Sequence, residues 1–157
     1  MRVLVVSDTH GLIEFAVQAL KEAGAVDLIL HAGDHYRDGK ALAEKTCLPV
    51  RSVAGNCDSR LEGPLELMIE VEGQRILLTH GHTMDVKKSG GKLLARAEET
   101  GAGAVVYGHT HAAGFSRERG ILLFNPGSVS IPRDGHRPSY GILEVTGEGI
   151  FPFVFRL

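Results

Sequence analysis

Residues 1–34 read MRVLVVSDTHGLIEFAVQALKEAGAVDLILHAGD, and this stretch predicts the fold. The apolar, valine-rich run Arg2–Val6 is typical of a buried strand. Leu12–Ala23 has apolar residues at helical spacing and ends before Gly24, a common helix stop. Val26–His31 is a second apolar run of strand length. The order strand, helix, strand is the signature of a parallel βαβ unit.

The alternation continues through the first half of the chain. Asp38–Lys45 predicts a shorter helix, and Val50–Ala54 predicts a third strand. Right-handed crossovers would place the carboxyl ends of all three strands on one rim of a sheet.

The second half changes character. Leu67–Val71 and Arg75–Thr79 predict a hairpin, and Ser89–Thr100 predicts a helix that ends at Gly101. Ala104–Tyr107 reads as a short buried strand. Four further strands with little helix between them are expected to form an antiparallel part of a second sheet: Gly114–Arg117, Ile121–Phe124, Tyr140–Val145 and Ile150–Arg156.

Size and composition favour one domain over residues 1–157. A chain of 157 residues with 43% hydrophobic and 23% charged residues can bury a sizeable core. The formal charge of -2 and the absence of a run of Lys and Arg argue against a broad nucleic-acid surface. No apolar run has the length of a signal peptide core or a membrane span, and Cys47 and Cys57 do not form a disulfide framework. We therefore expect a cytoplasmic location and no membrane partner.

Five short polar stretches, each following a predicted strand, carry the residue types that bind metals: Asp8-Thr9-His10, Gly33-Asp34, Gly55-Asn56-Cys57-Asp58, His80-Gly81-His82 and Gly108-His109-Thr110-His111. Residues two apart in an extended segment point to the same side, so one triplet can aim two side chains at one ion. The candidate metal ligands are seven: Asp8, His10, Asp34, Asn56, His80, His109 and His111. That number exceeds the needs of one four-coordinate ion and fits two ions that share a carboxylate and keep open positions.

Each stretch also has an ordinary structural interpretation. Asp8-Thr9-His10 alone would be taken as a helix cap, and Gly33-Asp34 alone as a turn. Gly108-His109-Thr110-His111 has few structural uses. The joint occurrence of all five, each at the end of a strand, favours a metal site.

The order Asp-x-His, Gly-Asp, Gly-Asn, His and Gly-His-x-His resembles that of the calcineurin-like metallophosphoesterase superfamily. The resemblance spans residues 8–111 and is closest to the small single-domain phosphodiesterases. Beyond this span, Asn125-Pro126-Gly127-Ser128 also resembles a motif of the smaller members. It implies an α/β fold, a four-layer αββα sandwich of two mixed β-sheets flanked by helices, with a two-metal site at one rim.

The resemblance also implies how the ligands divide. One metal would be held by Asp8, His10, Asp34 and His111, and the other by Asp34, Asn56, His80 and His109, with Asp34 bridging. Asp34, Asn56 and His80 are expected to act in catalysis. Ligands of this mixture suit divalent ions, and we expect manganese ahead of nickel, cobalt, zinc or iron.

The chain departs from the superfamily at Cys57. Many of its phosphatases carry a histidine there that protonates the leaving group, and a thiol with an ordinary pKa of about 8.5 is a poor substitute. We interpret Cys57 as a small, partly buried side chain and Asp58 as a carboxylate that orients a ligand histidine.

His82 faces either the substrate or the solvent, and the two alternatives stay open. The cations Arg60, Lys87, Lys88 and Arg133 belong to loops that could meet a phosphate, although most such residues are solvated.

The expected activity is metal-dependent hydrolysis of a small phosphodiester. Two metal ions neutralise the phosphate charge and lower the pKa of a bridging water, and the resulting hydroxide attacks phosphorus. The alternatives are a phosphomonoesterase of the same fold and, from another class, a non-catalytic protein-binding scaffold. A nuclease is disfavoured because the sequence lacks a basic stripe, and a homo-oligomer is compatible with it.

Overall fold

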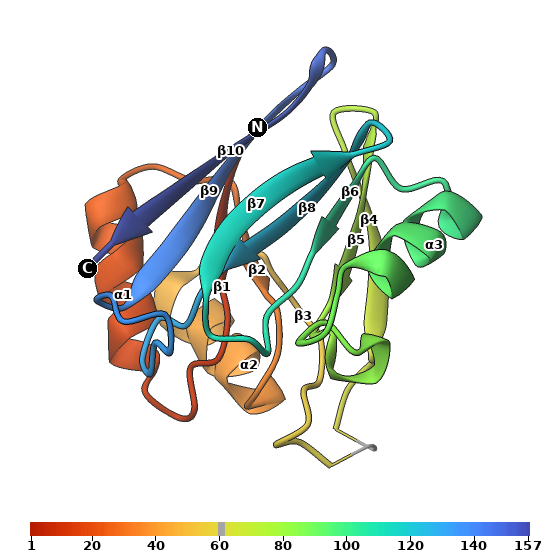
Figure 1. The fold of residues 1–157 in the computed structure, drawn as a ribbon. Coiled ribbons are helices and arrows are strands. Elements are labelled where there is room, and N and C mark those ends of the chain that lie inside the picture. Colours follow the sequence, from red (N-terminus) through yellow and green to blue (C-terminus); the bar gives the residue numbers. More distant parts are fainter. Residues whose placement is uncertain (60–61) are drawn as a thin grey trace.

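The computed structural model describes residues 1–59 and 62–157 of the chain. Two five-stranded mixed sheets pack face to face, with helices on their outer faces (Figure 1). The predicted αββα sandwich is therefore confirmed. None of the helices in the described ranges has both the length and the apolar character that crossing a membrane requires.

The first sheet has the order β10-β9-β1-β2-β3. Its strands are β1 (Arg2–Val6), β2 (Leu28–His31), β3 (Val50–Ser52), β9 (Ser139–Thr146) and β10 (Gly149–Arg156). β1, β2 and β3 are parallel, as the βαβ pattern predicts, whereas β9 and β10 run antiparallel. The helices α1 (Ile13–Ala23) and α2 (Tyr36–Thr46) cover the outer face of this sheet (Figure 1).

The second sheet has the order β4-β5-β6-β8-β7. Its strands are β4 (Glu66–Val71), β5 (Gln74–Thr79), β6 (Ala104–Val106), β7 (Ala113–Glu118) and β8 (Ile121–Pro126). The predicted hairpin is β4 and β5, and α3 (Gly91–Thr100) packs on the outer face. A short 3₁₀ turn, η1 (His82–Met84), follows β5.

One expectation about the second half was wrong. The strands predicted at Tyr140–Val145 and Ile150–Arg156 are β9 and β10, and they extend the first sheet by pairing β9 with β1. The sequence alternation of a strand shows which residues are buried but not which sheet buries them. The last four strands are therefore two antiparallel pairs in different sheets, β7 with β8 and β9 with β10.

The core explains why β1 is apolar from Val3 to Val6. Val3 and Val5 pack between the two sheets with Ile76 of β5, while Leu4 and Val6 pack on the other face against the helices. Each such side chain contributes roughly 1.5–3 kcal/mol when fully buried. A strand buried on both faces leaves polar residues only beyond its end, where the motifs lie.

The motif-bearing loops meet at one rim of the sandwich, the lower one in Figure 1. β1 ends two residues before Asp8, β5 ends one residue before His80, and β6 ends at Val106 before the Gly108 motif. The two sheets thus both supply loops to the same edge.

Candidate metal centre

Four candidate ligands form one tight cluster. The ligand atoms of Asp8, His10, Asp34 and His111 all lie within 4.8 Å of one another. His10 Nε2 lies 3.4 Å from His111 Nε2 and 3.8 Å from Asp34 Oδ2. His111 Nε2 lies 3.2 Å from Asp8 Oδ1. These are the residues that the family resemblance assigns to one metal.

The remaining candidates lie on the other side of Asp34. His80 Nε2 is 3.3 Å from Asp34 Oδ1 and 3.2 Å from Asn56 Oδ1. The ring centroids of His80 and His109 are 5.1 Å apart. Asp34 therefore presents Oδ2 toward His10 and Oδ1 toward His80, so the structure brings all seven candidate ligands together around this carboxylate.

The backbone achieves this convergence in a way that strand periodicity does not predict. The loops turn through left-handed conformations instead of continuing as extended strands, because five of the seven candidates have positive φ: Asp8 (55°), His10 (49°), Asp34 (56°), His109 (67°) and His111 (56°). Asp and His are enriched among residues that adopt this region, at a cost of order 1 kcal/mol each. Such strain is concentrated at functional sites.

Two glycines permit a close approach of loops at the site. A Cβ atom on Gly55 would lie 2.1 Å from Asp34 Oδ1, and one on Gly108 would lie 1.9 Å from Ser7 Oγ and 2.9 Å from Asp8 Oδ2. No other residue fits these positions without displacing a candidate ligand.

Backbone carbonyls fix the orientation of two histidine rings. His80 Nδ1–H donates to the Ala32 carbonyl at 2.8 Å, and His111 Nδ1–H donates to the Ile131 carbonyl at 2.6 Å. Since a carbonyl only accepts, Nδ1 carries the proton in each neutral ring and Nε2 offers its lone pair to the cluster. Ligand histidines are usually held in this manner.

The local electrostatics also suit metal binding. Burial lowers the pKa of His10, and burial together with the neighbouring His80 lowers the pKa of His109 to about 4. Both rings are neutral at pH 7, the form that binds metals. Burial alone would raise the pKa of Asp34, but His80 and the Cys57 N–H hold it below its ordinary value, so Asp34 is ionised.

Asp8 provides a test of whether the site fits a cation. Both of its carboxylate oxygens are buried and neither accepts a hydrogen bond of good geometry. A buried carboxylate in this state is costly unless a cation compensates its charge. With His10, Asp34 and His111 beside it, the donor set matches a borderline-to-hard divalent ion, so the cluster fits a metal.

Several neighbouring residues shape the loops. Asp58 accepts hydrogen bonds from the backbone N–H groups of Tyr36 (2.7 Å) and Gly55 (2.8 Å), so it fixes the turn that carries Asn56. Our expectation that Asp58 orients a ligand histidine is wrong, because its two carboxylate oxygens accept hydrogen bonds from backbone N–H groups, and the rings of His80 and His111 donate to backbone carbonyls.

The helix-cap interpretation of Asp8-Thr9-His10 is not supported, since the start of α1 has no side-chain cap. Asn125 holds a tight turn against the ligand loops by donating to the Gly108 carbonyl and to Thr110 Oγ1, both at 3.0 Å.

Two supporting residues, Asp38 and Ser130, had no sequence signal, whereas Ser128 belongs to the trailing motif named above. Asp38 at the start of α2 accepts hydrogen bonds from Thr9 Oγ1 (2.6 Å) and from Gly11 N (2.8 Å), and so holds the loop between Asp8 and α1. Ser128 and Ser130 both donate to the Asp8 carbonyl. A single aspartate near the start of a helix and a single loop serine are too common in sequences to be distinguished as supports.

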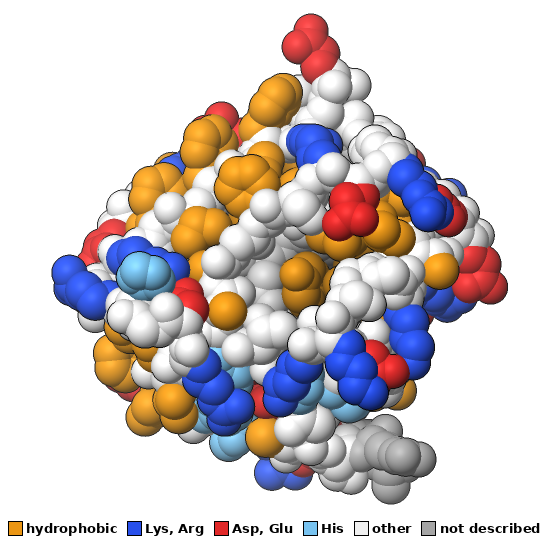
Figure 2. Space-filling model, in the orientation of Figure 1, with side chains coloured by type: hydrophobic (Ala, Val, Ile, Leu, Met, Phe, Trp, Pro, Cys, Tyr) orange, Lys and Arg blue, Asp and Glu red, His pale blue; other side chains and the backbone are white. Residues whose placement is uncertain are grey.

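Cations border the cluster. Figure 2 shows histidine side chains at the lower rim with Lys and Arg side chains beside them. Lys87 is near enough to contribute to the lowered pKa of His109, and Arg133 opposes the raised pKa of His111, which mainly reflects its contact with Asp8. Arg60, another candidate to meet a phosphate, lies outside the described residues.

Comparison with known proteins decides the family. The description of the matching family is "Calcineurin-like phosphoesterase superfamily domain", and it matches residues 1–148. The chain belongs to this superfamily. The superfamily membership and the Asp–His cluster together make this chain a metal-dependent phosphoesterase, and thus a phosphoric ester hydrolase.

Individual phosphoesterases in the superfamily are similar over nearly their whole length. "Probable metallophosphoesterase YsnB" of Bacillus subtilis is 38% identical over 149 residues, which cover 94% of this chain and 86% of that protein. "Phosphodiesterase YfcE" of Escherichia coli K12 is 32% identical over 170 residues, covering 92% and 88%. A predicted phosphoesterase from Streptococcus pneumoniae TIGR4 has a crystal structure with a TM-score of 0.78 and 31% identity, covering 98% and 96%.

The phosphoesterase fold is also that of Vacuolar Protein Sorting 29 from Cryptosporidium parvum, with a TM-score of 0.79 at 20% identity and coverage of 99% and 91%. At this identity the likeness shows the fold alone.

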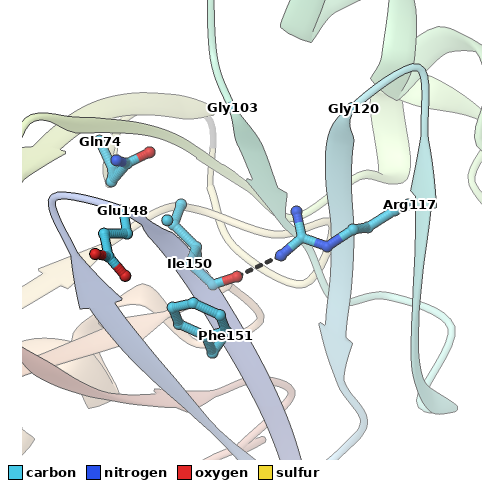
Figure 3. Close-up of a pocket in the computed structure, with 8 residues that line it drawn as sticks. Gln74, Gly103, Arg117, Gly120, Glu148, Ile150 and Phe151 are labelled. Atoms are coloured by element: carbon cyan, nitrogen blue, oxygen red, sulfur yellow. Dashed lines mark hydrogen bonds between the residues drawn. The ribbon is translucent and has the colours of Figure 1, made fainter.

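A separate cavity of about 460 Å³ lies away from the metal cluster, between the β9–β10 hairpin and the second sheet (Figure 3). Arg117 donates to the Ile150 carbonyl across it. None of the described residues that line this cavity belongs to the predicted site.

Proposed function

We propose that this phosphoesterase hydrolyses phosphodiesters and that it works with two divalent ions, manganese first among them. The observation that carries the proposal is the position of Asp34, whose two oxygens face different ligand sets at 3.8 Å (His10) and 3.3 Å (His80). When bound, a pair of divalent ions supplies neutralisation of the phosphate charge and an activated water.

The residues of the chain have distinct tasks in this proposal. His10, Asp8 and His111 would hold one ion, and Asn56, His80 and His109 the other, with Asp34 shared between them. The neutral rings of His10 and His109 need lose no proton before binding. Lys87 and Arg133 supply positive charge at the rim, which attracts an anionic ester.

Cys57 favours diesters over monoesters. The structure leaves Cys57 exposed and not partly buried as expected, yet local desolvation and the neighbouring Asp34 raise the pKa of this thiol to about 11, and its Sγ lies 3.4 Å from Asp34 Oδ2. A group with so high a pKa is a weak acid at neutral pH and cannot readily protonate a leaving alkoxide. Substrates with stabilised leaving groups, such as aryl diesters, depend least on that proton.

The proposal extends to the setting of the reaction. We infer one metallophosphoesterase domain over residues 1–157, acting in the cytoplasm on small diesters and not on nucleic acid or at a membrane, with a homo-oligomer compatible with this role. The relative named "Phosphodiesterase YfcE" supports the diesterase assignment.

The test is metal removal and reconstitution. We expect turnover of bis(p-nitrophenyl) phosphate to vanish after exhaustive chelation and to return with manganese, nickel or cobalt better than with magnesium. Magnesium prefers oxygen ligands and retains its waters, so a site rich in histidine disfavours it. Two ions per chain by metal analysis would accompany activity.

Three outcomes would contradict the proposal. Full activity with magnesium alone would contradict the assignment of a histidine-rich metal site. A preference for p-nitrophenyl phosphate at full metal occupancy would favour the phosphomonoesterase. Stable binding of two ions without turnover of either ester would favour the protein-binding scaffold.

A further inference from the structure

A cleft of about 660 Å³ opens beside the metal cluster, and it is lined in part by Asn56, Ser59, Leu65, His82 and Thr83. This volume lies within the range typical of sites for small organic ligands. Asn56 belongs at once to the cleft and to the second ligand set, because its Oδ1 lies 3.2 Å from His80 Nε2. The cleft is therefore continuous with the place where a phosphate would bind.

His82 marks the same junction. Its ring centroid is 5.4 Å from that of His80 and 6.2 Å from that of His109, and its side chain also lines the cleft, so it borders both. A phosphate group held by the second ligand set would direct one of its ester groups into this space. Of the two interpretations of His82 that the sequence leaves open, this position favours the one in which the side chain faces the substrate.

The walls of the cleft are fixed before any ligand binds. The Leu65 carbonyl accepts a hydrogen bond from Thr79 Oγ1 (3.2 Å), and the Pro64 carbonyl accepts one from Ala54 N (2.8 Å). These bonds hold the segment before β4 against both sheets. Leu65 nevertheless leaves 42% of its surface exposed, and this apolar surface faces a cleft rather than a partner element.

The charge of the cleft differs from that of the rim. None of the described residues that line the cleft is Lys or Arg, and Asp58 adds a carboxylate to it. At the rim, by contrast, Lys87 and Arg133 are near enough to influence the pKa values of His109 and His111. An anionic substituent in the cleft would meet repulsion from Asp58, and none of the lining residues that the structure describes supplies a compensating cation. An uncharged group would instead bury the exposed part of Leu65.

We propose that this cleft is the subsite for one organic group of the diester and that it selects an uncharged, partly apolar group of aryl size over a group that carries a second negative charge. The inference rests on the proposed diesterase function. Burial of the exposed part of a leucine is expected to strengthen binding by roughly 3–10-fold.

The experiment measures binding rather than turnover. Dissociation constants are determined by calorimetry for methylphosphonate, phenylphosphonate and 4-carboxyphenylphosphonate on the manganese-loaded protein. We expect phenylphosphonate to bind roughly 3–10-fold more tightly than methylphosphonate, and the added carboxylate to remove most of that gain. Leu65→Asp should bring the phenyl-to-methyl ratio toward one, and Thr83→Lys should raise the affinity for the carboxylated compound.

Phe151→Asp is the matched control, because Phe151 is 46% exposed but lies on β10, away from the site. It should leave the ratios as in the wild type. A phenyl-to-methyl affinity ratio near one in the wild type would overturn the subsite, and so would affinities that neither Leu65→Asp nor Thr83→Lys changes. In either case diester turnover would leave the proposed function standing. Expected ratios without diester turnover would overturn the proposed function alone, and absence of phosphonate binding to the manganese-loaded protein would overturn the subsite.

Discussion

At the scale of single residues, Asp34 carries the proposed site because its carboxylate faces both ligand sets. We expect Asp34→Asn to lower kcat/KM for an aryl diester by at least about 100-fold, since a neutral amide weakens the hold on both ions at once. Cys57→Ala should keep most of the activity, because a thiol with a pKa of about 11 is too weak an acid to assist a stabilised leaving group.

The two variants are compared by kinetics at saturating manganese, together with the metal content of each protein. An Asp34→Asn protein with wild-type turnover would refute the bridging role. A Cys57→Ala protein that binds both ions but is inactive would show that the thiol takes part in the chemistry.

Cys57 also tests why this chain would prefer diesters. Cys57→His places an imidazole with an ordinary pKa near 6.5 beside Asp34, and such a group can donate a proton at neutral pH. We expect the ratio of monoester to diester kcat/KM to rise, since general acid catalysis is worth about 10²–10⁴-fold when well placed. The gain should be smaller here because no neighbour was selected to orient the new ring.

The measurement compares benzyl phosphate, a monoester with a poor alkoxide leaving group, with the aryl diester bis(p-nitrophenyl) phosphate, and metal occupancy is confirmed in wild type and variant. A ratio that stays constant or falls at full occupancy would assign the preference to the shape of the cleft beside Leu65 instead of to the missing histidine.

At the scale of elements, the loop after β6 must pass close to the loop after β1. A Cβ atom on Gly108 would lie 1.9 Å from Ser7 Oγ, so we expect Gly108→Ala to displace Asp8 and to destabilise the fold by about 1–3 kcal/mol. Gly114→Ala, in β7, is the control because nothing lies within 4 Å of its added Cβ.

Urea unfolding and manganese titration distinguish the two variants. Gly114→Ala should match the wild type in both, whereas Gly108→Ala should lose metal affinity as well as stability. If Gly108→Ala keeps wild-type manganese affinity, the close approach of the two loops is not what positions Asp8.

These loops also show what sequence patterns cannot predict. The motifs identify Asp8, His10 and Asp34 as candidates, because the residue types and their places after strands are visible in the sequence. The expected route, alternate side chains of an extended segment, was wrong, since these three residues have positive φ. Asp38 was missed because its contacts with Thr9 and Gly11 join separate loops and leave no local pattern.

At the scale of the whole molecule, the four layers could be predicted, but the sheet to which β9 and β10 belong could not. The βαβ alternation through β1, β2 and β3 is a local pattern, and the family resemblance implied the sandwich. The pairing of β9 with β1 joins Val3 to Leu143 across most of the chain. The sequence pattern of β9 is compatible with a place in either sheet, so only tertiary packing decides which strand it pairs with.

The buried histidine His31 gives the folded chain a specific dependence on pH. Burial lowers its pKa from 6.5 to about 4, although the nearby Asp38 opposes that shift. Between these values the unfolded chain binds a proton that the folded chain excludes, so the free energy of unfolding should rise with pH across this window. The stabilisation is complete above about pH 6.5 and is lost as the pH falls toward 4, by up to about 3 kcal/mol.

His31→Gln isolates this contribution, because an amide can still bond to Thr9 Oγ1 and Ser52 Oγ, which lie 3.0 Å and 3.2 Å from the ring nitrogens. Urea unfolding is measured from pH 4.5 to 7.5 in chelator, so that no metal competes with protons for the histidines.

His10 and His109 titrate in the same direction in both proteins. The comparison therefore uses the difference between the two slopes of unfolding free energy against pH, and not the absolute stability. Other charges act on His31 from neighbouring elements: Asp8, Asp58 and His80. We expect a shallower profile for His31→Gln below pH 6.5, and parallel profiles would mean that folding does not exclude the His31 proton.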